Sequence, residues 1–206
     1  YQVAFTKYDA YLKQTNNSDS VMAYNCGVCA DQIKKYADAV KYFDVAIQKN
    51  YNVANAYARK AGALKDLKKD AEMVETLEAG LKIAPGNKTM EKLYAIHYLK
   101  EGQKFQKAND INKAEESYKQ VTTLSNKKWK TDALYSLGVL FYNNGANVLK
   151  KAAPLATSDA DKYATEKAAA DADFKKASDY LKEAVALSPD RAEIKKMLGQ
   201  VEESLK

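Results

Sequence analysis

Small residues recur after 34 positions, and this recurrence constrains the fold more than any other feature of the sequence. Gly27 is matched by Ala61, and Ala46 is matched by Gly80. Where two helices cross closely, small side chains let their axes approach to about 8 Å. Long stretches rich in Ala, Lys, Glu and Leu favour helix, and only three prolines and eight glycines interrupt them. The sequence therefore predicts an all-α chain built from a repeated pair of closely packed helices.

Large residues keep the same register around these small positions. In the second unit Tyr57, Leu64 and Leu77 surround them and Pro85 closes the unit. The unit resembles the tetratricopeptide repeat (TPR), two antiparallel helices marked by Leu-Gly, aromatic and Ala positions and a closing Pro. The resemblance covers roughly residues 20 to 206. It implies an α-solenoid of antiparallel helix pairs, a TPR-like superhelix.

The resemblance divides the chain, taken as a single domain over residues 1–206, into repeats flanked by two further helices. We expect a leading helix at about 1–16, repeats at about 20–53, 54–94, 95–130 and 131–190, and a closing helix at about 191–206.

Two irregular spacings predict elongated helices. Ala61 and Gly102 are 41 residues apart, so two extra turns are expected in a helix from about Lys88 to Ala108. In the last repeat an insertion occupies 146–172 and contains ten alanines, the best helix former. Both helices of that repeat are therefore expected to be elongated and to meet near Pro154. Ser158 is the expected N-cap of the second of these helices.

No catalytic, cofactor or metal site is predicted. Cys26 and Cys29 have the spacing of a redox motif, but no strand precedes them and Cys26 lies at a packing position beside Gly27. Three residues apart on one helix, they are poorly placed for an unstrained disulfide. A structural zinc takes four ligands, and the single histidine, His97, is 68 residues beyond Cys29. We expect core cysteines, a surface or partly buried His97, and a chain that is not an enzyme.

The charge pattern does not favour nucleic acid as a partner. The net charge is +6, but of 33 basic residues only Arg59 and Arg191 are arginine, and acidic residues are interleaved with the lysines. No run of eighteen apolar residues occurs, so no transmembrane segment is expected.

The resemblance places the binding surface on the concave wall formed by the first helix of each repeat. Its groove positions mix apolar, aromatic and amide side chains, and aromatic anchors are favoured in protein contacts. The candidate partner-binding residues are Tyr24, Val28, Asn55, Lys65, Leu99, Gln103, Lys107, Tyr135, Val139 and Tyr142. We expect a protein-interaction module that binds a peptide or protein segment in this groove.

One subclass of the family clamps a chaperone's C-terminal carboxylate with lysine and asparagine. The matching positions here hold Tyr24, Val28 and Ile96. Without those cations, C-terminal acidic chaperone peptides are expected not to bind.

Two alternatives remain open. The chain is a structural subunit or accessory domain of a bacterial envelope assembly that docks through its elongated 131–187 hairpin, or an accessory region of an enzyme encoded in flanking sequence. The start without Met and the Lys/Asn/Tyr-rich, histidine-poor composition favour a bacterial exported protein, in the periplasm or cell envelope rather than the cytoplasm. The sequence leaves the oligomeric state open.

Overall fold

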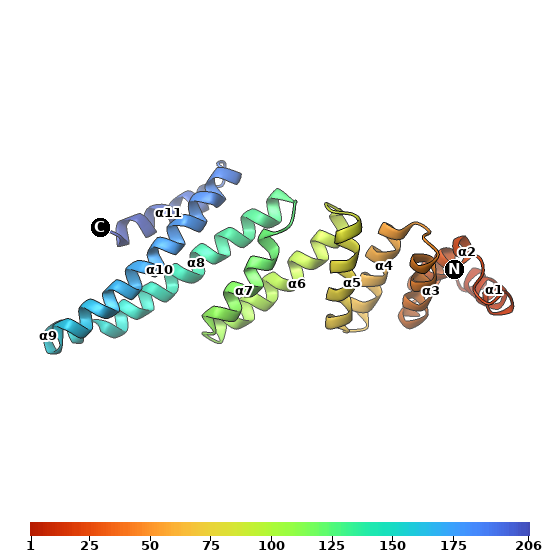
Figure 1. The fold of residues 1–206 in the computed structure, drawn as a ribbon, viewed down its shortest axis with the longest axis horizontal. Coiled ribbons are helices and arrows are strands. Elements are labelled where there is room, and N and C mark those ends of the chain that lie inside the picture. Colours follow the sequence, from red (N-terminus) through yellow and green to blue (C-terminus); the bar gives the residue numbers. More distant parts are fainter. The chain divides into compact units, whose positions relative to one another are not determined.

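The computed structural model describes residues 1–206 and contains helices and no strands (Figure 1). The helices are α1 (Gln2–Gln14), α2 (Ser20–Gln32), α3 (Tyr36–Gln48), α4 (Val53–Asp66), α5 (Asp70–Ile83), α6 (Lys88–Lys107), α7 (Ile111–Thr122), α8 (Lys127–Ala152), α9 (Leu155–Ser158), α10 (Ala160–Leu187) and α11 (Ala192–Ser204). The predicted all-α fold is confirmed. None of these helices is both long and apolar enough to span a membrane.

The helices form two compact units, Tyr1–Tyr94 and Ala95–Lys206, and the boundary between them falls within α6. In the first unit each helix from α1 to α5 packs against the next one along the chain. In the second unit α7 packs against α8, α8 against α10, and α10 against α11. Packing between successive helices is the arrangement that the repeat spacing predicted.

Left-handed residues make the tight turns between the two helices of a repeat. Lys34, Lys68 and Asn109 follow α2, α4 and α6 with φ of 61°, 59° and 59°. After α4, the amide of Lys69 donates to the carbonyl of Leu64 at 3.0 Å. This bond satisfies one of the carbonyls that the end of a helix leaves without a partner, and it reverses the chain direction.

The core of the first unit lies between α1, α2, α3 and α4. Its largest buried side chains include Leu12, Tyr42 and Phe43, each with no exposed surface. The Tyr42 hydroxyl donates a hydrogen bond to the Asp9 carboxylate of α1. The leading helix is therefore joined to the first repeat by both apolar packing and a polar contact.

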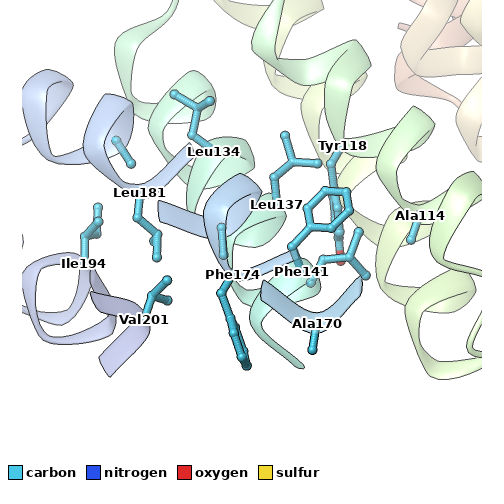
Figure 2. Packing of buried hydrophobic residues seen from close by; sticks show 13 residues of the cluster. Ala114, Tyr118, Leu134, Leu137, Phe141, Ala170, Phe174, Leu181, Ile194 and Val201 are labelled. Atoms are coloured by element: carbon cyan, nitrogen blue, oxygen red, sulfur yellow. The ribbon is translucent and has the colours of Figure 1, made fainter. Parts of the chain in front are cut away.

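The core of the second unit is built from α7, α8, α10 and α11. Figure 2 shows how its side chains meet, with Phe141 of α8 near Tyr118 of α7, and Leu181 of α10 near Ile194 of α11. One apolar face of α10 is buried between Ala170 and Ala184. Its fully or almost fully buried members are Ala170, Phe174, Ala177, Leu181 and Ala184.

The last helix pair is elongated, as predicted. α8 has 26 residues and α10 has 28, whereas the helices of the first unit have 13 or 14. The two long helices are joined at the base of the insertion, where Asn144 Nδ2 donates to Asp173 Oδ2 at 2.7 Å. The extra turns predicted between Lys88 and Ala108 are also present, as the 20 residues of α6.

The predicted cap of α10 is wrong by one residue. Ser158 still belongs to α9, and its hydroxyl donates to the carbonyl of Pro154 at 3.1 Å. Asp159 has the non-helical backbone that an N-cap needs, with φ of −157° and ψ of 86°, and its Oδ1 accepts from the amide of Lys162 at 3.1 Å. The hydroxyl is already used within α9, so the carboxylate takes its place.

Candidate functional site

All ten candidate partner-binding residues lie on the first helices of their repeats. Four belong to the first unit and six to the second. They are Tyr24 and Val28 on α2, Asn55 and Lys65 on α4, Leu99, Gln103 and Lys107 on α6, and Tyr135, Val139 and Tyr142 on α8.

Tyr24 and Val28 are one helical turn apart on α2, half-buried, and packed against the core of the first unit. The Tyr24 ring lies 5.8 Å from the ring of Phe43 and 5.8 Å from the ring of Tyr51, edge-on in both cases. Edge-to-face pairs of this kind hold an aromatic ring in one orientation. Tyr24 therefore presents a fixed, partly exposed surface.

Asn55 and Lys65 are exposed on α4 and make their polar contacts locally. Asn55 Nδ2 donates to Asn52 Oδ1 at 2.8 Å, and Lys65 Nζ lies 3.6 Å from Asp66 Oδ1. Both groups stay accessible to solvent, where such contacts are weak and easily exchanged.

Tyr135, Val139 and Tyr142 form the α8 face, defined by these three residues. Steps of four and three place them on one side of the helix. The two tyrosines pack against the core of the second unit, and the Tyr142 ring centroid is 5.7 Å from that of Phe174. Val139 is half-buried between them. The α8 face is thus an apolar strip with two anchored rings.

Leu99, Gln103 and Lys107 follow one another at steps of four on α6. Leu99 packs against the core of the second unit, whereas Gln103 and Lys107 are exposed. This side of α6 therefore changes from apolar to polar and cationic toward its C-terminal end.

Sequence reasoning missed a hollow of about 290 Å³ between α6 and α7. Tyr98, Glu101 and Phe105 of α6 line one wall. The other wall includes Lys113, Glu116 and Ser117 of α7. The repeat pattern assigned the aromatic residues of α6 to packing, and nothing in the spacing indicated that two carboxylates share the same hollow.

The cysteines and the histidine are placed as predicted. Cys26 and Cys29 are buried free thiols. Burial, with a smaller contribution from the charge of Asp9, raises the pKa of Cys26 to about 12, so its reactive thiolate form is scarce at neutral pH. His97 is half-buried and meets the ring of Tyr98 edge-on at 5.1 Å. No group of three or more His, Cys, Asp or Glu side chains is arranged to hold a metal ion.

Comparison with known proteins identifies the repeat. The tetratricopeptide repeat family model matches residues 54–87. A crystal structure of a TPR repeats protein from Bacteroides fragilis is 67% identical in sequence, with a TM-score of 0.93. The match covers 98% of this chain and 91% of that one. The structure of MamA protein is 12% identical over 90% of this chain and 81% of its own, with a TM-score of 0.44, too low to inform fold or function. A comparison with curated proteins finds no match.

These similarities agree with the packing described above. Small residues at the repeat positions face large side chains of the partner helix, and successive helices pack in pairs. Proteins with this fold generally mediate protein–protein interaction and are typically non-enzymatic scaffolds. The chain belongs to the tetratricopeptide repeat family.

Proposed function

We propose that this chain is a protein-interaction module that binds a peptide or protein segment along the first helices of its repeats. Within the second unit, Ala95–Lys206, we assign the contact with the bound segment to the α8 face. The observation that supports it is the half-exposed row of Tyr135, Val139 and Tyr142, whose two rings are anchored by the core behind them.

Anchored tyrosines suit this role for an energetic reason. A flexible side chain loses rotamer entropy when a partner immobilises it, at about 0.5–1.5 kcal/mol for each side chain. Tyr142 is already packed against Phe174, so little of that cost remains. Each tyrosine also has a hydroxyl for a polar contact beside its apolar ring, which is why this residue type is enriched at protein interfaces.

The side of α6 that carries Leu99, Gln103 and Lys107 suggests which segments would fit. Gln103 adds an amide and Lys107 an ammonium group. A segment with apolar side chains for the α8 face and a carboxylate or carbonyl for α6 would match both. Ile96, Tyr24 and Val28 do not supply the cations of a carboxylate clamp, so acidic C-terminal chaperone peptides are still expected not to bind.

Val139 is the best residue for a test because the tyrosines also support the core. Peptides would be selected from a random display library on the immobilised protein, and the dissociation constant of the best binder measured by titration calorimetry. Val139→Glu places a charge in the middle of the α8 face and should weaken binding about tenfold or more. Val3→Glu, at a valine of α1 that is 70% exposed, is the matched control and should leave affinity unchanged. Equal affinity of both variants and the unmodified chain would remove the α8 face from the proposal.

A second candidate function uses the elongated α8–α10 hairpin to dock in an assembly. The favouring observation is that packing continues into the insertion, where Ala170 of α10 belongs to the core of the second unit and Ala146, Val148 and Leu149 of α8 pack against that core. Residues 146–172 can be replaced by a loop of about four residues, since Asn144 and Asp173 are in contact where the deletion would close. Under this alternative the shortened chain should lose self-association or assembly in light-scattering measurements of mass and should keep peptide binding. If the unmodified chain has the same mass as a monomer at all concentrations, the docking role loses its support.

A further inference from the structure

We propose that the hollow between α6 and α7 binds a basic side chain, a lysine or arginine of a protein partner. None of its lining residues belongs to the α8 face, so this site is separate from the peptide contact proposed above.

A fixed carboxylate forms one wall of the hollow. Ser117 is buried, with 4% of its surface exposed, and its hydroxyl donates to Glu101 Oε2 at 2.9 Å. This bond holds the carboxylate in one orientation and uses only one of its two oxygens, Oε2. A positioned carboxylate is a strong acceptor for an ammonium or guanidinium group, because hydrogen bonds to ionised groups are about twice as strong as neutral ones.

The negative charge of the hollow is not balanced by its own lysine. Lys113 pairs with Asp110 at 3.2 Å, and no ion pair joins Glu101 or Glu116 to a lysine or arginine. Because Lys113 is paired with Asp110, the carboxylates of Glu101 and Glu116 give the lining a net negative charge. A partly buried carboxylate without a cation favours a ligand that brings one.

The aromatic wall suits the stem and head of such a side chain. Phe105 already has a cation above its ring, since Lys113 Nζ lies 5.5 Å from the ring centroid. This contact shows that the ring turns a face toward cationic groups at the edge of the hollow. Tyr98 adds a second apolar surface against which a methylene stem can lie.

The size of the hollow limits the ligand. Pockets for drug-sized molecules and cofactors range from about 300 to 1,000 Å³, and a volume of about 290 Å³ lies at the bottom of that range. Because the hollow is open along the α6–α7 groove and not enclosed, it fits one long side chain entering from a neighbouring protein better than a whole cofactor.

The test uses the full chain labelled with ¹⁵N and a capped tripeptide, acetyl-Gly-Lys-Gly-amide. We expect its addition to shift the amide signals of residues around Glu101 and Ser117. The same peptide with norleucine in place of lysine keeps the apolar stem without the charge, and it should bind at least about tenfold more weakly. The double variant Glu101→Gln, Glu116→Gln should weaken the lysine peptide by a similar factor and leave the circular dichroism melting curve unchanged, since glutamine can still accept from Ser117.

Glu166→Gln is the matched control, because it removes one carboxylate from α10 away from the hollow. It should leave the titration unchanged. Equal binding of the lysine and norleucine peptides, or of the unmodified chain and the folded double variant, would overturn the proposal. If n-butylammonium binds more tightly than the lysine peptide, the site takes a free amine and the assignment to a protein partner is wrong. Val139→Glu should not change these titrations, so failure of this proposal and failure of the α8 face can be told apart.

Discussion

The Cα of Gly27 on α2 lies directly against the ring of Phe43 on α3. A Cβ built on Gly27 would be 2.8 Å from Cε1 and 2.9 Å from Cδ1 of that ring, closer than real side chains approach one another. Phe43 is fully buried and cannot easily move away. Gly27 is therefore required by the partner helix and not by its own helix, in which glycine is a poor residue.

We predict that Gly27→Ala lowers the free energy of unfolding by about 1 kcal/mol. Overpacking costs about 1–3 kcal/mol, and the better helix propensity of alanine returns up to about 1 kcal/mol. Gly62→Ala on α4 is the control, because a Cβ at that position meets nothing within 4 Å. It should stabilise the chain by about 0.5–1 kcal/mol. Urea unfolding measures both, and a gain in stability for Gly27→Ala would show that the helices are less closely packed than described.

Alkaline pH should destabilise the first unit through the Cys26 thiol. In the unfolded chain this thiol has a pKa near its usual value of 9.0, and in the folded chain burial raises the pKa to about 12. The folded state therefore retains the proton that the unfolded state loses, so this contribution is intact below pH 9 and is lost as the pH rises toward 12. The slope is at most about 1.4 kcal/mol per pH unit.

The measurement compares urea unfolding of the unmodified chain and of Cys26→Ala at intervals between pH 8 and pH 11. Lysines also titrate in this range, and they do so equally in both proteins. The Cys26→Ala variant should start less stable and lose stability less steeply. Parallel curves would mean that the thiol is ionisable in the folded chain.

Lys68, whose backbone is in the left-handed region, is a position for a stabilising substitution. Lys68 has a φ of 59°, a conformation that costs an L-residue about 1–2 kcal/mol and glycine almost nothing. Lys68→Gly should raise the free energy of unfolding by about 0.5–1 kcal/mol after the greater chain entropy of glycine in the unfolded state is subtracted. Lys65→Gly, at an exposed lysine in the last turn of α4, should instead lower it, by up to about 1 kcal/mol. Thermal denaturation of the pair should show opposite shifts, and shifts of the same sign would contradict this account of the turn.

The repeat spacing was sufficient to predict the fold because one physical requirement recurs. Gly27 faces Phe43 and Gly102 faces Tyr118, sixteen positions later in each case, and Gly138 faces Leu181 across the elongated pair. Each repeat needs a small residue where the partner helix inserts a large one, so the pattern is visible in the sequence even where the consensus is degenerate. The elongation of the last pair was predictable for the same reason, because an alanine-rich insertion cannot form a long loop without losing its strong helix preference.

The candidate site was predictable only in part. Helical spacing alone puts Tyr135, Val139 and Tyr142 on one side of α8, and whether they bind a partner stays a prediction. The spacing could not show that Asn55 bonds to Asn52, because that contact depends on side-chain rotamers. The hollow at Glu101 was missed because it depends on which neighbouring groups satisfy each carboxylate. Which groups pair with a carboxylate depends on local side-chain geometry, and the periodicity of the sequence does not specify that geometry.

The start of α10 tests the capping assignment, because the side chains of two adjacent residues, Ser158 and Asp159, can both cap a helix and only Asp159 does so here. Asp159 Oδ1 accepts from the Lys162 amide at 3.1 Å, and its negative charge lies at the positive end of a 28-residue helix. Asp159→Ala should cost about 1 kcal/mol locally, whereas Ser158→Ala, which removes only a bond to the Pro154 carbonyl, should cost a few tenths. Because the tip of the hairpin can open without unfolding the core, the measurement is hydrogen exchange at the amides of residues 161–164. Exchange there should speed up about fivefold in Asp159→Ala and remain nearly unchanged in Ser158→Ala. If exchange instead speeds up in Ser158→Ala and stays unchanged in Asp159→Ala, Ser158 is the cap in solution and α10 begins one residue earlier.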